Sequence, residues 1–424
     1  MRSIPPITAH LNMSSIRRHW RAGLVVIAGL LVVILATAPW NGSSASRPTA
    51  GGPAGAAGKP VAAAPHATKA KAPVNPTKKI NTHVVLRSPG RTNVHWPSVG
   101  AAAVSVIGVG AVGNHYGYKK VPTASIAKAM TAYVILKHHP LKGNAQGPTL
   151  TVTHAEAAAF PHQVAIAESV VPVRSGERIT ERQALQALML ASAGNVAQIL
   201  ARWDAGSVHA FLKKMNATAK QLGMTRTHYT DPSGYDKHTV STAIDQMKLA
   251  NKAMYLPGFR QIVGQKTAVI PVAGRIKNTN KLLREHGVTG IKTGSMSAAG
   301  GCLLFSAKTT VGGHTVSIAG TVLGQRSSAI GDLNQAFVSS HNILASLRPA
   351  LKPVMIVHKG QVVMHVPGTK STLVATANGT VPGWGGMAVP SAVTATVSPS
   401  AANGAHVGTL TVGSYVHVPL ALHK

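Results

Sequence analysis

The chain has a single cysteine among its 424 residues, which excludes an intrachain disulfide. This residue, Cys302, begins the apolar run Cys302-Leu303-Leu304-Phe305, so we expect it to be a small buried side chain. Histidines number 21, yet none forms a compact metal-ligand pattern such as His-Glu-x-x-His, and we interpret them as surface and packing residues. We therefore predict neither a metal site nor a cofactor.

Acidic residues are also scarce: ten Asp and Glu stand against 42 Lys and Arg, for a formal net charge of +32. All ten lie between Glu156 and Asp332, so both flanks of the chain are cationic. We do not expect nucleic acid as a partner, because neither zinc-finger spacing nor an RNP-like aromatic motif occurs. We expect anionic wall polymers or lipid headgroups to bind the flanks, with simple solubility or adaptation to an acidic medium as the alternative.

The N-terminal sequence predicts attachment to a membrane. Residues 1–21 are basic, and residues 22–38 are 17 uncharged residues rich in Leu, Val and Ile. This run is at the short end for a membrane span and at the long end for a signal-peptide core. An A-x-A sequence ends the run, but Pro39 would follow the cut. We predict a cytoplasmic tail, a retained signal anchor and an extracytoplasmic remainder, with a cleaved signal and a secreted protein as the alternative.

Three further regions follow from composition. Residues 39–97 are rich in Ala, Pro, Gly, Ser, Thr and Lys, which predicts a flexible linker. Residues 98–350 place helical patterns between β-type runs and predict an α+β domain, in which Thr180 and Gln183 have the spacing of a helix capping box. Residues 351–424 predict a small all-β domain. Its expected strands are Val354–Val357, Gln361–Val366, Ser371–Ala377, Val393–Val397, Val407–Val412 and Tyr415–Val418.

The stretch Pro122–Ala132 carries the first chemical signal, a serine and a lysine three residues apart. Proline favours a helix start, so we predict a buried helix beginning just after Pro122. Positions i and i+3 share a helix face, so Ser125 and Lys128 can touch. A serine hydroxyl needs a base within hydrogen-bond reach to become a nucleophile, and a desolvated lysine can be that base. Alone, the pair is also compatible with a core helix that carries a solvated lysine.

Other motifs make the pattern specific. Lys292-Thr293-Gly294 lies far downstream, and the combination of Ser-x-x-Lys with Lys-Thr-Gly marks penicillin-binding proteins and class A β-lactamases. With Tyr229–Asp236, Asn278–Leu283 and Gly290–Cys302, the stretch Pro122–Ala132 resembles the D-alanyl-D-alanine carboxypeptidase family, the low-molecular-mass serine-type penicillin-binding proteins. The resemblance covers roughly residues 98 to 350. It implies a β-lactamase-like fold, an antiparallel sheet with helices, and an often-present C-terminal β domain.

The resemblance also implies catalytic roles. Ser125 would attack the carbonyl between two D-alanines of a peptidoglycan stem peptide, and Lys128 would take its proton. Ser192 would bridge towards the leaving amine. Water would then release the acyl-enzyme, whereas a β-lactam would be trapped at the same serine.

Substrate binding is expected at the Lys-Thr-Gly triplet. By the resemblance, Lys292 and the Thr293 hydroxyl hold the terminal carboxylate. The backbone N–H groups of Ser125 and Ser295 form the oxyanion hole. Gly294 lets the substrate backbone approach this strand edge closely.

One position departs from the family pattern. The second motif of the family is Ser-x-Asn, and aligning it on Ser192 leaves Gly194 where Asn is expected, with Asn195 one residue later. In the family this Asn side chain would hydrogen-bond the substrate amide. We therefore expect a slower enzyme in which Gly194→Asn raises the acylation rate, unless Asn195 takes over as a substrate-binding residue.

Three alternatives remain open from the sequence. A D,D-endopeptidase would cut cross-links with the same machinery. A β-lactamase is disfavoured, because no Glu is evident as a deacylating base in a recognisable loop. A wall-binding homologue with weak or no activity would keep the fold without turnover.

Overall fold

The computed structural model describes residues 77–424. The predicted cytoplasmic tail at 1–21 and signal anchor at 22–38 lie outside the described residues, as does most of the predicted linker. Within residues 77–424, no helix combines the length and apolar character needed to cross a membrane.

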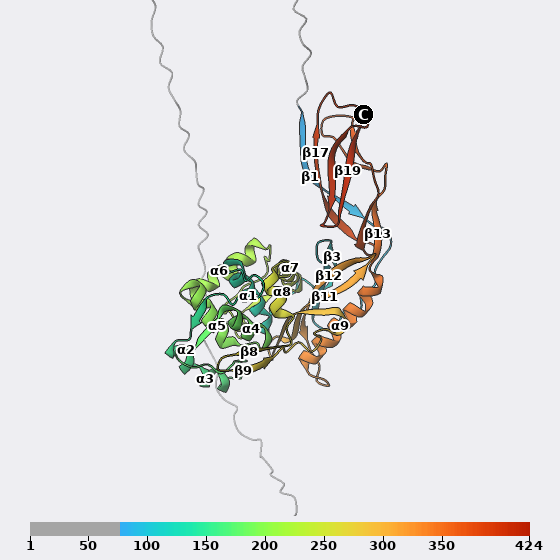
Figure 1. Ribbon diagram of the computed structural model, residues 1–424. Helices are drawn as coiled ribbons and strands as arrows, with labels where there is room; N and C mark the ends of the chain where they lie inside the picture. Colours follow the sequence, from blue (N-terminus) through green and yellow to red (C-terminus); the bar gives the residue numbers. More distant parts are fainter. Residues whose placement is uncertain (1–76) are drawn as a thin grey trace, which may run out of the picture. The chain divides into compact units, whose positions relative to one another are not determined.

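A five-stranded antiparallel sheet forms the centre of the region predicted as α+β (Figure 1). Within its strand β11 (Gly300–Val311), Leu303 and Phe305 join one hydrophobic cluster, whereas Cys302 and Leu304 join another. Side chains alternate between the two faces of a strand, so both faces are covered, and the predicted burial of Cys302 is confirmed. The strand order is β10-β11-β12-β2-β3, with β10 Val288–Met296, β12 His314–Gln325, β2 Ala101–Val106 and β3 Gly110–His115.

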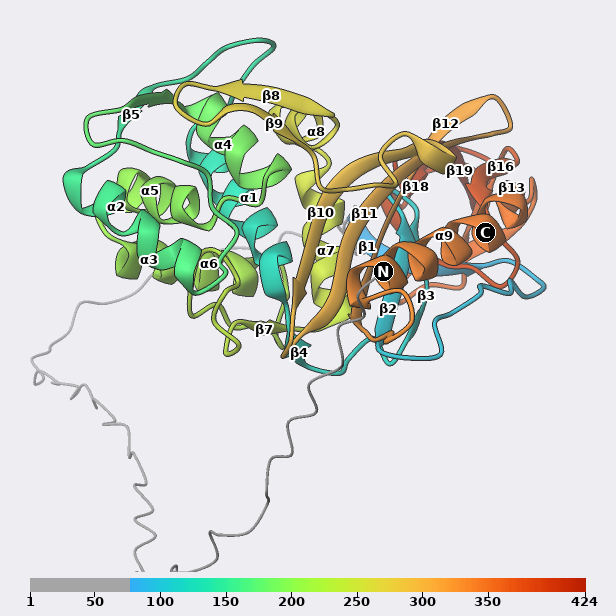
Figure 2. The ribbon, with the colours of Figure 1, turned by 90° about the horizontal axis from the view of Figure 1, so that it is seen from below.

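Helices cover the two faces of this sheet. Helix α9 (Asp332–Ala350) packs on β11 and β12, and Figure 2 shows it lying against these strands. Helix α7 (Ala243–Ala253) packs on β2 and β12. Helix α1 (Lys128–His138) contacts both α7 and the helices beyond it, and every residue from Lys128 to Leu136 is buried. Helix α1 is therefore a core element, as its apolar sequence predicts.

The start of that helix differs in detail from the prediction. A 3-10 turn, η1 (Ala124–Ala127), precedes α1, so regular α-helix begins at Lys128 rather than directly after Pro122. Pro122 itself belongs to the two-residue strand β4 (Val121–Pro122), which pairs with β7 (Val240–Ser241). The turn places Ser125 ahead of the first α-helical residue.

The predicted capping box is confirmed. Thr180 Oγ1 accepts from Gln183 N at 3.2 Å, and Gln183 Oε1 accepts from Thr180 N at 3.0 Å. Because both reciprocal bonds form, α4 (Glu181–Leu190) begins where the sequence predicts. The other helices here are α2 His154–Ala158, α3 Phe160–Ala165, α5 Gly194–Ala205, α6 Val208–Gln221, α8 Pro257–Val263 and η2 Glu285–Gly287. Two further hairpins pair β5 Thr149–Thr151 with β6 Arg178–Thr180 and β8 Thr267–Ile270 with β9 Gly274–Lys277.

The C-terminal residues form the predicted all-β structure. A six-stranded antiparallel sheet has the order β1-β17-β18-β19-β15-β14, and a separate pair joins β13 to β16. An α+β fold followed by an all-β C-terminal region is therefore confirmed. The strand bounds are β13 Lys352–Val357, β14 Val362–His365, β15 Thr372–Ala375, β16 Gly379–Gly383, β17 Ala388–Val397, β18 His406–Val412 and β19 Val416–His423.

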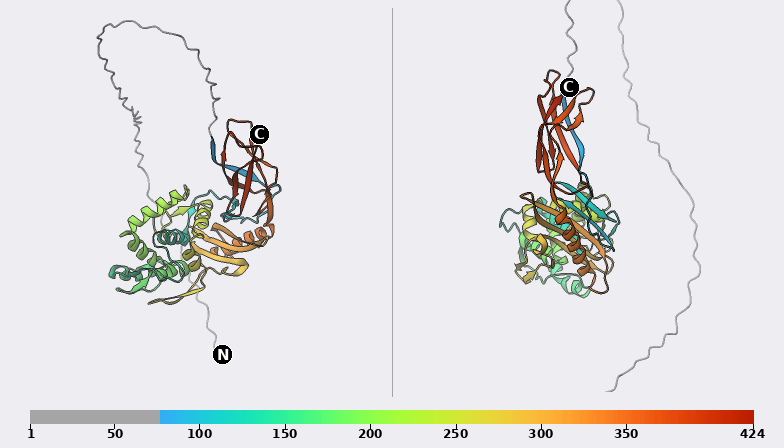
Figure 3. Two further views of the ribbon diagram at one scale, coloured as in Figure 1. Left: turned by 45° about the horizontal axis from the view of Figure 1, so that its top comes forward. Right: turned by 90° about the vertical axis from the view of Figure 1, so that its right-hand side faces the viewer.

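One strand of this sheet corrects the linker prediction. Residues Lys78–Arg87 form β1, which pairs with β17 along its whole length, from Lys78 opposite Val397 to Arg87 opposite Ala388. Figures 1 and 3 show this strand, in blue, beside strands drawn in red. Ile80 and Leu86 are buried in the same cluster as the core of the β region. These apolar and β-branched residues gain burial only through a partner about 300 residues later, which local composition does not reveal.

Candidate active site

Ser125 and Lys128 meet at the junction of η1 and α1. The Lys128 Nζ atom lies 3.0 Å from Ser125 Oγ and donates to the backbone oxygen of Ser233 at 2.8 Å. Ser125 is half-buried, whereas Lys128 is 1% exposed. The three-residue spacing therefore places a hydroxyl next to an amine that is almost fully removed from water.

The surroundings of Lys128 favour its neutral form. Burial lowers the pKa of Lys128 to about 8, although the carboxylates of Glu168 and Asp231 act in the opposite direction. Burial, and then the charge of Lys128, lower the pKa of Lys292 well below its ordinary value. A lysine whose pKa lies near working pH can accept a proton from an adjacent hydroxyl, which is the requirement for a general base.

Strand β10 carries the Lys-Thr-Gly triplet beside this pair. Lys292 Nζ donates to the backbone oxygen of Thr293 at 3.0 Å, and the Thr293 hydroxyl lies 2.6 Å from that of Thr279. A Cβ atom at Gly294 would lie 3.0 Å from the backbone nitrogen of Ser125. Gly294 therefore lets the strand approach η1 closely, and its predicted role in admitting the substrate backbone stays a prediction.

An open cavity of about 680 Å³ gives access to the serine. Ser125, Lys128 and Ser295 line it together, so three of the predicted residues share one surface. Its remaining lining residues are Ala124, Ile166, Ala167, Glu168, Ser169, Gly234, Tyr235, Asp236, Lys237, Met296, Ser297 and Ala298. Lys292 and Thr293 are buried beneath this surface, at 1% and 4% exposure.

Ser192 and Asn195 flank the α4–α5 junction. Ser192 is buried and has a φ of +64°, a left-handed conformation that is uncommon for serine. The Asn195 amide is bound at both ends: Nδ2 donates to Val171 O at 2.7 Å and Oδ1 accepts from Val171 N at 3.3 Å. Asn195 thus holds the backbone at Val171, and its assignment as a substrate-binding residue is corrected because its polar atoms are already paired.

The sequence predicts no role for Asp231 and Ser233, two residues of the Tyr229–Asp236 motif that lie at this site. Asp231 Oδ2 accepts from Ser233 N at 3.1 Å and from Ser233 Oγ at 2.7 Å, and its Oδ1 accepts from Thr239 Oγ1 at 2.6 Å. These bonds fix the turn that presents the Ser233 carbonyl to Lys128. The motif was visible in the sequence, but the contact to Lys128 depends on packing between distant segments.

A third missed residue, Glu168, occupies the space beside Gly194. A Cβ atom at Gly194 would lie 2.0 Å from Glu168 Oε1 and 2.7 Å from Glu168 Cδ. A side chain at position 194 would therefore displace the Glu168 carboxylate, and the expectation that Gly194→Asn speeds acylation stays a prediction. Nothing in the local sequence around residue 194 indicates that a carboxylate arrives there from the loop after α3.

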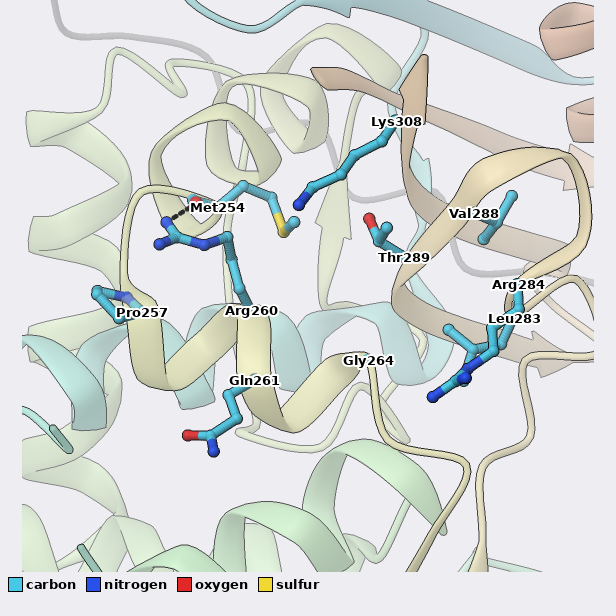
Figure 4. Close-up of a pocket in the computed structure, with 10 residues that line it drawn as sticks. All are labelled: Met254, Pro257, Arg260, Gln261, Gly264, Leu283, Arg284, Val288, Thr289 and Lys308. Atoms are coloured by element: carbon cyan, nitrogen blue, oxygen red, sulfur yellow. Dashed lines mark hydrogen bonds between the residues drawn. The ribbon is translucent and has the colours of Figure 1, made fainter. Parts of the chain in front are cut away.

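A second cavity, of about 430 Å³, lies at the other end of β10 and contains none of the predicted catalytic residues. Figure 4 shows Arg260, Arg284 and Lys308 around it, with Arg260 Nη1 donating to Met254 O at 2.6 Å. Its lining has three basic side chains and no carboxylate. The cavity therefore has the charge of a site for an anion.

The geometry agrees with comparisons to known proteins. The sequence profile of the D-alanyl-D-alanine carboxypeptidase family matches residues 113–326. The chain is 36% identical over 222 residues to a D-alanyl-D-alanine carboxypeptidase of a Streptomyces species, covering 48% of this chain and 73% of that protein. It is 31% identical over 194 residues to a D-alanyl-D-alanine endopeptidase of Escherichia coli, covering 43% of this chain and 58% of that protein.

Solved structures give the same assignment. The crystal structure of a Streptomyces DD-transpeptidase is similar with a TM-score of 0.51 and 30% identity, covering 60% of this chain and 98% of that one. A penicillin-binding protein homologue of Mycobacterium tuberculosis gives a TM-score of 0.50 at 27% identity, covering 60% of this chain and 96% of that one. The chain belongs to the D-alanyl-D-alanine carboxypeptidase family of serine hydrolases.

Proposed function

We propose that this protein removes the terminal D-alanine from peptidoglycan stem pentapeptides through an acyl-enzyme on Ser125, and that penicillins block it there. The observation that carries the proposal is the contact of 3.0 Å between Ser125 Oγ and a buried Lys128 Nζ. Membership of the family supports stem peptides as substrates and β-lactams as ligands.

In the first step the Ser125 hydroxyl gives its proton to neutral Lys128 Nζ, and its oxygen attacks the carbonyl carbon of the scissile amide. Negative charge then forms on the carbonyl oxygen, where the N–H groups of Ser125 and Ser295 would stabilise it. The C–N bond breaks when the leaving D-alanine amine receives the proton held by Lys128, for which Ser192 is the proposed relay, and Lys128 becomes neutral again. Water next attacks the ester, gives up a proton and restores the Ser125 hydroxyl.

Lys292 and Thr293 would bind the terminal carboxylate of the substrate. Lys292 is almost fully removed from water, and a carboxylate entering beside it would favour its charged form. Such binding brings a counter-ion to Lys292, whose Nζ atom donates its hydrogen bonds to the two oxygens of Thr293. The carboxylate of the bound substrate would therefore supply the negative charge that pairs with Lys292.

The test is covalent labelling. The protein is incubated with benzylpenicillin, its intact mass is measured, and the adduct is located by peptide mapping. We expect one adduct, on Ser125, and none in Ser125→Ala. An adduct on another residue, or one that persists in Ser125→Ala, refutes the assignment, and complete absence of labelling favours a wall-binding homologue without activity.

A D,D-endopeptidase is the second candidate, because relatives of that name are about equally similar, at 31% identity. The two activities differ in substrate, not in the Ser125 chemistry. Release of free D-alanine from a pentapeptide identifies the carboxypeptidase, and cleavage of cross-linked dimers identifies the endopeptidase. We expect the pentapeptide to be the better substrate.

The proposed location is outside the cytoplasmic membrane, with residues 22–38 as the anchor. The support is the sequence: a basic N-terminal segment followed by 17 uncharged residues and then Pro39. N-terminal sequencing of protein recovered from membranes tests this. A mature chain that starts near Pro39 or later would mean that the segment is removed and the protein is secreted.

Anionic wall polymers or anionic lipids are the proposed second class of partner. Supporting observations are the absence of Asp and Glu from residues 333–424 and the cavity that contains Arg260, Arg284 and Lys308. Binding to purified walls should weaken between 0.1 M and 1 M salt, because the screening length falls from about 10 Å to about 3 Å. Sedimentation that does not depend on salt would contradict the proposal.

A further inference from the structure

Glu168 and Gly194 form a pair in which the carboxylate occupies the space that a side chain at position 194 would need. The closest approach of a Cβ atom at residue 194 to Glu168 Oε1 is 2.0 Å, so glycine at 194 is required for Glu168 to lie where it does. The same carboxylate lines the cavity with Ser125 and Lys128. We propose that Glu168 is a positioning residue of this active site, which stabilises the ammonium that forms on Lys128 when Ser125 gives up its proton.

The segment that carries Glu168 is tied down on both sides. Gly194 N donates to Ser169 O at 2.7 Å, and Tyr235 Oη donates to Ile166 O at 2.7 Å. Ala167, directly before Glu168, has a φ of +57°, a left-handed conformation that is strained for alanine. Hydrogen bonds on both sides of the strained Ala167 fix the backbone at Glu168. The Glu168 side chain is therefore held in one direction, unlike a freely rotating surface side chain.

Three charged groups from the surrounding elements interact electrostatically with Lys128: two carboxylates raise its pKa, and Lys128 itself lowers the pKa of a second lysine. Glu168 comes from the loop after α3, Asp231 from the turn before β7, and Lys292 from β10. The Asp231 carboxylate is already bound to Ser233 and to the Thr239 hydroxyl. Burial raises the pKa of Glu168, and the charge of Lys128 opposes that rise, so the two groups favour each other's ionised forms.

The role follows from the acylation step of the proposed function, on which this inference rests. The proton moves from Ser125 Oγ to Lys128 Nζ, so the lysine becomes positively charged inside the protein. A carboxylate lining the same cavity lowers the free energy of that charge separation in its ionised form, which the charge of Lys128 favours. Glu168 neither gains nor loses a proton in the step. It makes Lys128 a stronger base, and it raises the pH at which that base becomes available.

The isosteric variant Glu168→Gln tests the charge alone. Removing the carboxylate lowers the pKa of Lys128, so the acid limb of the pH–rate profile for acylation by benzylpenicillin should move to lower pH. The weaker base should also reduce the rate on the plateau, by roughly two- to fivefold. Glu285→Gln, at an exposed carboxylate away from the cavity, is the matched control and should reproduce the wild-type profile. A Glu168→Gln profile that superimposes on the wild type refutes the proposal.

The variant Gly194→Ala tests the pairing with Glu168 left intact. Its added methyl group takes the place of the Glu168 carboxylate, so the acid limb should move in the same direction as in Glu168→Gln. The double variant should differ little from either single one, because both remove the same interaction. Additive effects, or an unmoved acid limb in Gly194→Ala, contradict the pairing.

Thermal unfolding of each variant separates this role from a structural one. If Gly194→Ala does not fold, the pH–rate profile of Glu168→Gln alone tests the proposed role of Glu168. If benzylpenicillin labels Ser125 in all folded variants, the proposed function is supported whatever the pH profiles show. If it fails to label the wild-type protein, the proposed function is refuted, and not the role of Glu168 alone.

Discussion

The two folded regions bury different kinds of side chain. The region with the catalytic residues buries five charged side chains to 4% exposure or less: Lys128, Glu181, Arg182, Asp245 and Lys292. Among the described residues after 351, Ser391 is the only buried polar residue, and the rest of that core is apolar. The β region is thus stabilised by apolar burial and strand pairing, whereas the catalytic region combines its apolar core with buried charge.

Buried charge is unfavourable unless it is paired, by several kcal/mol per ion. Most charged groups here have partners: Arg182 Nε donates to Ala145 O at 2.6 Å, and Asp245 Oδ2 accepts from Arg226 N at 2.9 Å. Lys128 is different, because a carbonyl and a hydroxyl are its hydrogen-bond partners and its carboxylates act from farther away. The comparison teaches that this region buries an amine without a directly bonded carboxylate at the position where proton transfer requires a neutral base.

The largest effect expected from this comparison is that of Lys128→Ala. Without the base the Ser125 hydroxyl keeps its proton, so acylation by benzylpenicillin should slow by about 10²–10⁴-fold. Lys137→Ala, at an exposed lysine of the same helix, is the control and should acylate at the wild-type rate. Stopped-flow labelling measures both, and a Lys128→Ala rate within tenfold of the wild type would contradict the assignment.

The second-largest expected effect is a loss of stability in the β region, where Leu410 on β18 is 0% exposed. Leu410→Ala should lower the free energy of unfolding of this region by about 2–5 kcal/mol. Acylation of Ser125 should continue at an unchanged rate while the protein is folded. Val362→Ala, at 50% exposure on β14, is the control for a surface strand. Urea unfolding measures the stability of both variants, and benzylpenicillin labelling measures their acylation rates. An equal loss of unfolding free energy in Leu410→Ala and Val362→Ala would contradict the prediction.

The smallest expected effect is a dependence of the stability of the catalytic region on pH. Burial raises the pKa of Glu181 from its ordinary value of 4.5 to about 7, and neither of its carboxylate oxygens has a hydrogen-bond partner. The folded protein therefore binds this proton more tightly than the unfolded chain does. Stability contributed by the protonated form is present below pH 4.5 and is lost as pH rises through about 7.

Glu181→Gln remains neutral, so it should remove this part of the pH dependence and stabilise the protein at pH 8 by on the order of 1–3 kcal/mol. Urea unfolding at pH 5 and pH 8 measures the difference. Because the β region has no acidic residue, its own unfolding should not show this slope. A Glu181→Gln protein with the wild-type pH dependence would show that the side chain is solvated in solution.

Features set by neighbouring residues could be predicted from the sequence. The contact between Ser125 and Lys128 depends on a three-residue spacing, and the cap of α4 depends on Thr180 and Gln183. The burial of Cys302 follows from the apolar run around it. Local spacing determines these contacts because the helix or strand itself brings the groups together.

Features that join distant segments could not be predicted in the same way. Strand β1 gains its burial from β17, and Glu168 reaches the space beside Gly194 from a different loop. Asn195 follows the motif serine by three residues, yet its amide binds Val171. In each case the sequence shows a suitable side chain, but its partner is determined only by the tertiary packing.

The pairing of β1 with β17 also sets an order of events during synthesis. Val84 pairs opposite Ser391, so β1 must wait until nearly the whole chain has emerged before its hydrogen bonds can form. The segment from Ala101 to Ala350 contains every strand of the central sheet and can complete its pairing earlier. During that interval β1 is an unpaired strand, open to pairing with other chains. A chain that ends before Ala388 would never supply the partner, and its β1 would stay exposed after synthesis is over.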